Sequence, residues 1–143
     1  MALKQIDHGT PEYKKMVSLR DEMLRRPLGL SFAKEELERE KDDILIAAFD
    51  DDKMLGCCLL TATSSQTVRL RQMAVRNSLQ GKGIGESILR FAETLARDKG
   101  FRKITMHART SAIGFYERCG YKTCSEEFIE VTIPHKEMEK WVL

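Results

Sequence analysis

The stretch that decides the fold is RQMAVRNSLQGKGIG, which occupies residues 71–85. An alternating strand pattern over 67–75 runs into a loop with Gly81, Gly83 and Gly85, and an amphipathic helix begins at once. The first N–H groups of a helix have no internal acceptor, and the helix dipole adds about half a positive charge there. Glycines let an anion approach that backbone without meeting a Cβ atom. The stretch therefore predicts a phosphate-binding loop.

The distribution of charge also favours an anionic ligand. From Met54 through Gly85 there is no Asp or Glu, whereas the same segment carries Arg69, Arg71, Arg76 and Lys82. Sheet regions are poor in carboxylates in any case, so a chance gap in the acidic residues is the alternative interpretation.

Two familiar nucleotide-binding loops are excluded by the spacing. A Walker loop needs Gly-Lys-Ser/Thr, but Lys82 is followed by Gly83. A dinucleotide fingerprint needs a third glycine at the position of Glu86. It also needs an acidic residue at the end of the next strand, where the sequence has MHA at 106–108.

The segment QGKGIG at 80–85 resembles the pyrophosphate loop of the GCN5-related N-acetyltransferases, the GNAT superfamily, whose pattern is Gln/Arg-x-x-Gly-x-Gly/Ala. The strand end MAV at 73–75 matches as well. A second segment, AIGFYERCGY at 112–121, is similar to the family signature Ala-x-x-Phe-Tyr-Glu-Lys-x-Gly-Phe. The tail FIEVTIPHKEM at 128–138 resembles a small bacterial subgroup with a Gly-Ile-Pro-His ending, but Thr132 stands where that subgroup tends to have glycine.

Hydrophobic periodicity predicts the remaining elements. Strands are expected at 3–7, 44–49, 54–62, 67–75 and 103–108, and two closing strands at 121–128 and 136–143. Helices are expected at 11–24, at 31–41 with Ser31 as its cap, from Ile84 to just before Gly100, and at 111–119. This order predicts a single domain over 1–143 with an α/β (α+β) fold. The resemblance implies the GNAT acyl-CoA N-acyltransferase fold, a mixed sheet of about six to seven strands with about four helices.

The resemblance implies an N-acetyltransferase that moves an acetyl group from acetyl-CoA to a primary amine by direct attack in a ternary complex. It places cofactor contacts at Met73, Ala74, Val75, Gln80, Gly81, Lys82, Gly83, Ile84, Gly85, Glu86, Ser111 and Tyr116. Tyr116 is expected to protonate the coenzyme A sulfur, since phenols and thiols have similar pKa values. Arg109 stands where the family often has Asn, which changes the expected cofactor contacts on that side.

The amine must lose a proton before it attacks, and no base is evident from the motifs. His107 is the best-placed imidazole, a group whose ordinary pKa suits base catalysis. Glu130 and His135 are candidate residues of the acceptor site. Each of the three could instead be an ordinary hydrogen-bonded strand residue, and a water chain could serve as the base.

Bulk properties narrow the partners. The chain has 24 Lys and Arg against 22 Asp and Glu, a net charge of +2, which argues against nucleic-acid binding. No apolar run approaches the roughly 20 residues that cross a bilayer, and 1–11 has no signal-peptide block, so a cytoplasmic protein is expected. The four cysteines lack metal-ligand spacing, so no metal is expected.

The acceptor stays open between a small-molecule amine and a lysine of a peptide or protein, and a homodimer is compatible with the resemblance. Two alternatives remain. The chain could be a non-catalytic acyl-CoA-binding or sensor module on the same fold, or a transferase for another acyl group or for protein lysines.

Overall fold

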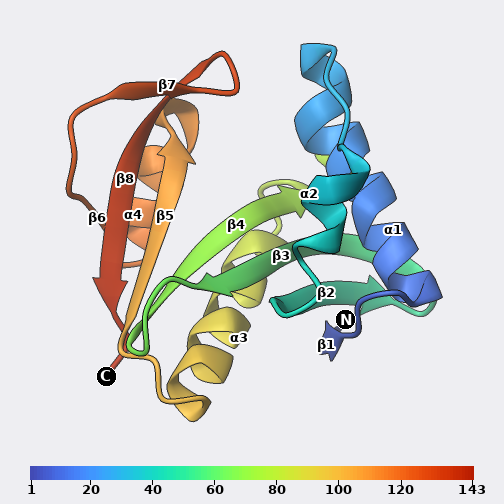
Figure 1. The fold of residues 1–143 in the computed structure, drawn as a ribbon, viewed down its shortest axis with the longest axis horizontal. Helices are drawn as coiled ribbons and strands as arrows, with labels where there is room; N and C mark the ends of the chain where they lie inside the picture. The colour runs from blue at the N-terminus through green and yellow to red at the C-terminus, as the bar shows by residue number, and fades with distance from the viewer. The chain divides into compact units, whose positions relative to one another are not determined.

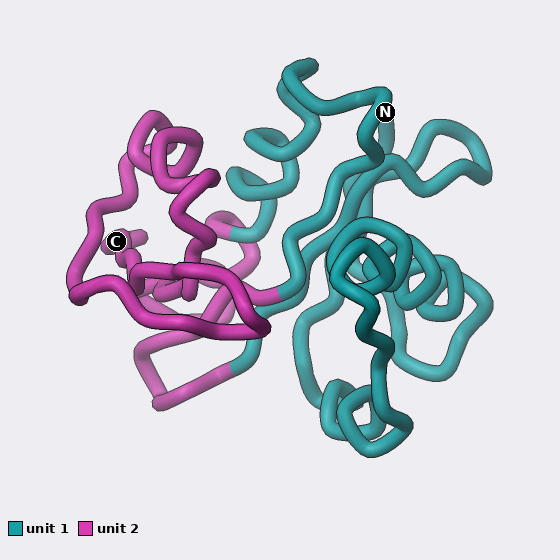
Figure 2. Tube along the Cα trace, turned by 90° about the horizontal axis from the view of Figure 1, so that it is seen from above, with its two compact units in different colours: residues 1–61, 72–92 teal, residues 62–71, 93–143 magenta.

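The computed structural model describes residues 1–143, and Figure 1 shows their helices and strands in chain order. The chain divides into two compact units, which Figure 2 colours separately. The first unit contains residues 1–61 and 72–92, and the second contains residues 62–71 and 93–143. Strand β4 (Thr67–Val75) and helix α3 (Ile84–Asp98) contribute residues to both units.

The first unit is built on antiparallel strands. β1 (Ala2–Ile6) pairs with β2 (Ile44–Asp50), and β2 pairs with β3 (Lys53–Ala62). The pair Asp50↔Lys53 closes the β2–β3 hairpin, which joins two of the strands expected from the sequence. β2 and β3 are buried along most of their length, so both faces of this part of the sheet are covered. The unit's core contains Ile6, Tyr13, Met16, Leu19, Leu45, Ala47, Phe49, Met54, Cys57, Leu59 and Ala74.

Helix α1 (Pro11–Arg20) begins where the sequence predicts. The Thr10 hydroxyl accepts a hydrogen bond from Tyr13 N at 3.2 Å, and Pro11 occupies the first turn, where no N–H is needed. The path then continues as a π-helical turn, η1 (Asp21–Arg25), and a 3-10 turn, η2 (Arg26–Leu28). Gly29 ends η2 with a φ of +72°, a left-handed angle that glycine adopts without strain. The helix predicted over 11–24 is therefore confirmed in place, but its last part is π-helical.

The second helix is shorter than predicted. It was expected over 31–41 with Ser31 as its cap, but α2 spans only Lys34–Glu38 and Ala33 stands at its N-cap position. The carboxylate of Glu36 accepts the Ala33 N–H at 3.3 Å. A side chain three residues inside the helix thus satisfies a backbone donor that Ser31 was expected to serve.

The second unit combines parallel and antiparallel pairing. The beginning of β4 runs parallel to β5 (Lys103–Arg109), in a register that extends from Thr67↔Lys103 to Leu70↔Met106. β5 pairs antiparallel with β8 (Ile133–Trp141), which also pairs with β6 (Lys122–Thr123) and β7 (Phe128–Glu130). The fold is α+β with a mixed sheet and four helices, as expected, but the sheet has eight strands instead of about six to seven.

The two closing strands predicted at 121–128 and 136–143 are wrong in extent, because three strands occupy this region. The pair Glu130↔Ile133 closes a β7–β8 hairpin around Val131 and Thr132, whose φ angles are +51° and +64°. Two-residue hairpin turns with positive φ usually carry Asn-Gly or Asp-Gly. Since Val-Thr is not a turn signal, the sequence pattern did not reveal this hairpin.

Helix α3 presents the apolar face that its 3.6-residue period predicts, and Ile84, Ile88, Leu89, Ala92 and Ala96 are buried. Its end is also as expected. Gly100 has a φ of +90°, and the Phe101 N–H returns to the Ala96 carbonyl at 2.9 Å. Helix α4 (Ile113–Arg118) ends in the same way at Gly120, where φ is +95°. A 3-10 turn, η4 (Thr110–Ala112), links β5 to α4.

Candidate functional site

The glycine loop of the first unit connects β4 to α3. A 3-10 turn, η3 (Asn77–Leu79), follows the strand, and residues 80–83 lead into the helix at Ile84. Gly81 and Gly83 both have a φ of +83°, in the left-handed region that favours glycine. A Cβ atom added to either would meet no other atom within 4 Å. The space above both α-carbons is therefore open to an approaching group.

The beginning of α3 supplies the donors of this site. The Ser87 N–H reaches the Gly83 carbonyl at 3.0 Å, which is the first intrahelical hydrogen bond. The N–H groups before Ser87 thus precede the helical ladder, and the dipole of the 15-residue helix makes this end positive. Glu86 lies in the first turn, but its carboxylate bonds to Arg90 at 2.7 Å, which partly offsets its negative charge.

Gln80 holds the loop to the strand that precedes it. Its side-chain Nε2 donates to the carbonyl of Val75 at 3.1 Å and to Oδ1 of Asn77 at 3.3 Å. The side chain of Gln80 therefore stabilises the loop itself, while Lys82 is exposed.

Arg76 makes its contacts within the first unit, with residues of β3 and of η1. Its Nε donates to the Met54 carbonyl at 2.7 Å, its backbone N–H donates to the Leu55 carbonyl at 3.1 Å, and its guanidinium lies 3.6 Å from Glu22. The arginine thus ties the end of β4 to β3 and to the π-helical turn.

The end of β4 departs from regular strand geometry. Gln72 has a φ of +58° in the middle of the strand, a left-handed backbone angle that non-glycine residues rarely adopt. The next residues, Met73, Ala74 and Val75, are those expected to face the cofactor arm.

Beneath this segment, Gly56 of β3 allows close packing. A Cβ atom added to it would lie 2.9 Å from the Ala74 oxygen and 2.9 Å from Cδ1 of Ile88 on α3. Only glycine fits there without a shift, so Gly56 sets how closely β3, the end of β4 and the first turns of α3 approach. Sequence reasoning missed this residue, although a glycine inside a strand often signals such a close approach.

The second signature lies in the second unit. Tyr116 on α4 is buried, with 7% of its surface exposed. Its ring packs edge-on against Phe115 at 5.0 Å and against Tyr121 at 6.0 Å. Ser111 lies in η4 and is exposed. The α4 cap fixes the helix against the following segment, because the Tyr121 N–H bonds the Tyr116 carbonyl at 3.0 Å.

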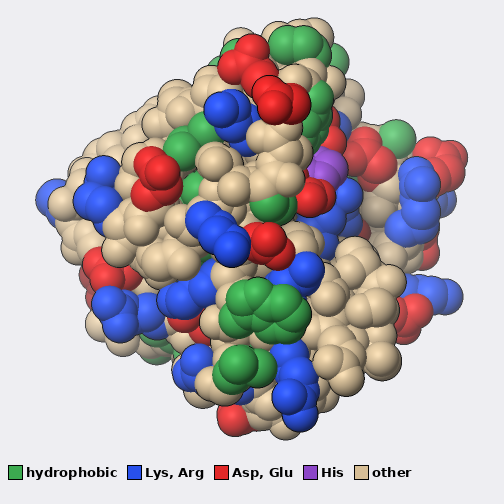
Figure 3. Space-filling view, turned by 90° about the vertical axis from the view of Figure 1, so that its left-hand side faces the viewer, with side chains coloured by type: hydrophobic (Ala, Val, Ile, Leu, Met, Phe, Trp, Pro, Cys, Tyr) green, Lys and Arg blue, Asp and Glu red, His purple; other side chains and the backbone are tan.

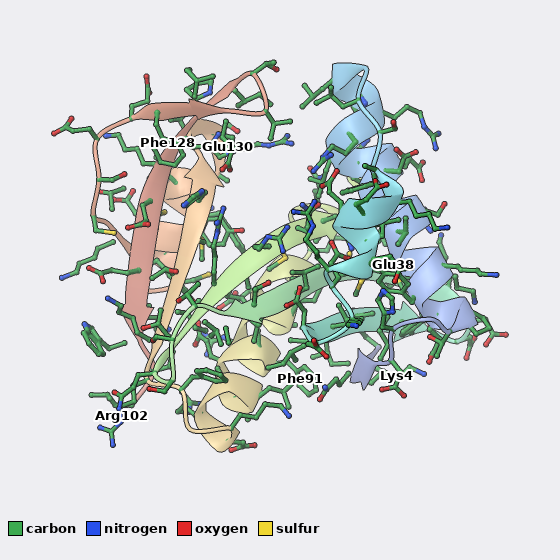
Figure 4. The ribbon with its side chains drawn as sticks, in the orientation of Figure 1. Lys4, Glu38, Phe91, Arg102, Phe128 and Glu130 are labelled. Carbon is green, nitrogen blue, oxygen red and sulfur yellow. The ribbon has the colours of Figure 1, made fainter.

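The candidate base His107 and the two candidate acceptor-site residues, Glu130 and His135, lie together in the second unit. His107 on β5 has its Nδ1 atom 2.9 Å from the Glu130 carboxylate on β7, and His135 Nε2 on β8 lies 3.9 Å from the same carboxylate. The ring of Phe128 contacts both histidines, edge-on to His107 and stacked on His135. Figure 4 labels Phe128 and Glu130 on the short strand β7.

Two further charged groups complete this cluster. Arg69 Nη2 on β4 lies 2.7 Å from His107 Nδ1, and Glu137 on β8 lies 3.8 Å from His107 Nε2. Burial alone would raise the pKa of Glu130, but its hydrogen bond with His107 and the nearby positive charges lower this pKa overall. Burial is also the main reason why the pKa of Arg69 falls below its usual value. Sequence reasoning noted the charge of Arg69 but not its partner, because the contact joins residues 38 positions apart.

His135 has a structural role as well as its place in the cluster. It is buried, and its Nδ1 atom lies 2.7 Å from the Ile133 carbonyl. That contact fixes the imidazole next to the β7–β8 turn.

Other features bear on the expected partners. No group of three or more histidine, cysteine, aspartate or glutamate side chains is arranged to hold a metal ion. None of the helices is both long and apolar enough to span a membrane. The face in Figure 3 shows basic and acidic side chains interspersed, with a histidine side chain lying among both.

The sequence matches a known protein family and several of its relatives. The family model described as an acetyltransferase (GNAT) domain matches residues 22–142. An uncharacterized N-acetyltransferase of Bacillus subtilis, YjcF, is 32% identical over 107 residues, which are 74% of this chain and 74% of that protein. The chain spans about half the length, or less, of the first curated relatives that it matches, with 40% of one and 50% of another covered.

Solved structures agree on the fold. An acyl-CoA N-acyltransferase from Pseudomonas aeruginosa superimposes with a TM-score of 0.82 at 19% identity, over 97% of this chain and 98% of that one. An aminoglycoside 6′-N-acetyltransferase complexed with coenzyme A gives a TM-score of 0.79 at 18% identity, over 100% of this chain and 98% of that one. From the match of the family model over most of its length, the chain belongs to the GNAT acetyltransferase domain family.

Proposed function

We propose that residues 1–143 form one acetyltransferase domain that moves an acetyl group from acetyl-CoA to an amine by direct attack. The observation that carries the proposal is the glycine loop before α3, where Gly81 and Gly83 adopt left-handed φ angles and the space above them is open. The membership of the chain in the GNAT family supports acetyl-CoA as the donor.

The residues present fit the diphosphate of coenzyme A. Its negative charge suits the N-terminal end of α3, where N–H groups precede the helical ladder. In the proposal, the backbone of 81–86 and Lys82 bind the diphosphate, and Gln80 holds the loop in shape. The backbone of Met73, Ala74 and Val75 binds the pantetheine arm, and Ser111 adds a contact. The aminoglycoside acetyltransferase named above was solved with coenzyme A, which supports a similar use of this fold.

Acetyl-CoA, when bound, supplies a thioester whose carbonyl carbon is attacked by the amine nitrogen, so that a C–N bond forms and the C–S bond breaks. We assign the proton that the departing thiolate takes up to the Tyr116 hydroxyl. Burial of Tyr116 between Phe115 and Tyr121 supports this role, because the packed aromatic rings hold the phenol in one orientation. Ordinary thiol and phenol side chains have pKa values of about 8.5 and about 10, so proton transfer from a phenol to an alkyl thiolate such as that of coenzyme A costs only about 2 kcal/mol.

The proton that the amine loses is assigned to His107. Its place in a cluster with Glu130 supports this role, because a hydrogen bond from one ring nitrogen to the carboxylate fixes the orientation of the ring and leaves the lone pair on the other nitrogen. Glu130 and His135 are proposed to line the acceptor site with it. The acceptor itself is proposed to be a small-molecule amine or a lysine side chain of a peptide or protein.

The first experiment tests cofactor binding. Gly83→Val forces a β-branched residue into the left-handed region, at a cost of about 1–2 kcal/mol, and we expect acetyl-CoA binding measured by calorimetry to be lost. Gly100→Val is the matched control, since Gly100 has a φ of +90°, also has no atom within 4 Å of an added Cβ, and lies at the other end of α3. The control should lose similar stability in thermal unfolding but keep its affinity. Equal affinity in both variants and the parent would refute the loop assignment.

The second experiment tests turnover. Thiol release from acetyl-CoA is measured with a panel of amines for the parent and for Tyr116→Phe. We expect acetylation of at least one amine, and a loss of kcat without a loss of acetyl-CoA binding in the variant. Binding without acetylation of any amine, combined with no effect of Tyr116→Phe, would support a non-catalytic acyl-CoA sensor instead.

A further inference from the structure

The Nδ1 atom of His107 has two partners that it cannot satisfy together. Arg69 Nη2 lies 2.7 Å from it and Glu130 Oε1 lies 2.9 Å from it, both within hydrogen-bond distance. A guanidinium can only donate a hydrogen bond, and an ionised carboxylate can only accept one. A ring nitrogen either carries a proton or offers a lone pair, so only one of these contacts is a hydrogen bond at a given moment.

Each partner selects a different tautomer of the neutral ring. If Nδ1 accepts from Arg69, the proton sits on Nε2, and Nε2 then has no lone pair with which to take a proton. If Nδ1–H donates to Glu130, the lone pair is on Nε2, and Nε2 becomes the basic atom. The hydrogen bond that Nδ1 makes thus decides whether Nε2 carries a proton or offers a lone pair.

Every strand around the ring contributes a charged group to this balance. Arg69 projects from β4, with Arg71 exerting a repulsive charge on it, while Glu130 projects from β7 and Glu137 from β8. Glu137 lies 3.8 Å from Nε2, too far for a direct hydrogen bond, so it does not by itself hold a proton there. His135 Nε2 lies 3.9 Å from the second oxygen of Glu130, whereas Oε1 lies 2.9 Å from His107 Nδ1.

The surroundings keep both competitors in place. Arg69 is half-buried, its Nε atom is buried without a hydrogen-bond partner, and its Nη2 atom lies 2.7 Å from His107 and 3.7 Å from Glu130. Glu130 is held on β7 by the β7–β8 hairpin, and the edge of Phe128 lies against the His107 ring at 5.0 Å.

We infer that Arg69 and Glu130 are opposing positioning residues that compete for His107 Nδ1, with Arg69 holding the ring in its non-basic tautomer and Glu130 in its basic one. The effect of this competition on catalysis rests on the proposed function, in which His107 takes the proton of the amine. The state of the ring, however, is measurable without any turnover.

The test reads the ring directly. Protein labelled with nitrogen-15 in its histidines is examined by long-range proton–nitrogen correlation, in which a protonated ring nitrogen and a bare one have clearly different shifts. The samples are the parent, Arg69→Met and Glu130→Met, with Arg102→Met and Glu126→Met as matched controls at exposed positions of the second unit. Signals of His8, which lies in the first unit, serve as an internal reference.

The expected shifts have opposite signs. Arg69→Met should move the proton toward Nδ1, and Glu130→Met should move it toward Nε2. Each ratio of tautomers should change by about tenfold or more, because a hydrogen bond to a charged partner is worth that much. The two controls should leave the ratio unchanged. Since circular dichroism identifies a variant that fails to fold, the other variant still decides the matter.

The outcomes separate this inference from the proposed function. If the same nitrogen carries the proton in the parent and in both cluster variants, the inference is overturned. If the tautomer shifts as expected but the acetylation rate does not rise with the Nδ1–H population, the inference holds and the role of His107 as base fails. If the rate follows that population, both hold.

Discussion

Removing one partner of the buried ion pair in the first unit should destabilise the protein strongly. Arg20 on α1 and Glu40 after α2 are 0% and 2% exposed, and two hydrogen bonds of 2.8 Å and 2.7 Å join them. The Tyr13 hydroxyl donates a third bond to Glu40 at 2.7 Å. Burial and the adjacent carboxylate both raise the pKa of Tyr13, so it remains a donor across the physiological range.

The magnitude follows from burial. In Arg20→Met, the Glu40 carboxylate keeps only the Tyr13 hydroxyl and loses its counter-charge, and an uncompensated buried charge costs about 3–5 kcal/mol. A domain of this size has roughly 5–15 kcal/mol of stability in total, so the loss would be a large fraction of it. Glu40→Gln should cost a similar amount, because it leaves Arg20 buried without its anion. The double variant Arg20→Met/Glu40→Met should cost less than the sum of the two single changes, since no charge is left behind.

The assay is equilibrium urea unfolding followed by circular dichroism. The chain offers a matched control in Arg90 and Glu86, a pair of the same chemistry on the surface of α3, with side chains 75% and 46% exposed. Arg90→Met should cost no more than about 0.5 kcal/mol. If Arg20→Met costs no more than Arg90→Met at equal urea dependence, the argument that burial sets the strength of the pair is wrong.

Two further predictions concern the β7–β8 hairpin. Thr132→Gly should stabilise the protein by about 1 kcal/mol, because Thr132 adopts a φ of +64° that glycine reaches without strain, and a lower or unchanged midpoint in urea unfolding would contradict this. The second prediction concerns how Glu130 makes stability depend on pH. Because its pKa is lower in the folded chain than its ordinary value of 4.5, its contribution to stability is complete above that value and is lost as the pH falls through the folded pKa. The free energy of unfolding should therefore fall less steeply below pH 4.5 in Glu130→Gln than in the parent, and identical slopes would exclude the linkage.

Much of the fold could be predicted because its signals are local. The 3.6-residue period of α3, the proline at the start of α1 and the glycine after α3 act within a few residues, so their positions in the structure agree with the sequence. The errors arose where local signals were absent. α2 is shorter than expected, and at its start the Glu36 carboxylate accepts the backbone N–H of Ala33, while Ser31 lies outside the helix. The β7–β8 hairpin escaped detection because its turn residues, Val131 and Thr132, do not favour a positive φ.

In the candidate site, too, some features could be predicted from local sequence and others could not. The glycine loop was readable because a run of adjacent residues creates it, and Gly81 and Gly83 do adopt the left-handed angles that make glycine necessary there. The left-handed backbone angle of Gln72 and the close packing at Gly56 could not be predicted from the sequence, since both depend on how neighbouring strands and α3 meet.

The sequence by itself determined the order of the elements, the phosphate-type loop and the resemblance that led to the family. These features depend on the backbone angles that residues prefer and on the spacing of hydrophobic residues, and both are properties of short segments. Only the tertiary structure decided that Arg69 and Glu130 meet at one nitrogen of His107, and that Arg20 and Glu40 pair out of contact with water. Those contacts join separate elements, and their strength depends on the burial that packing creates.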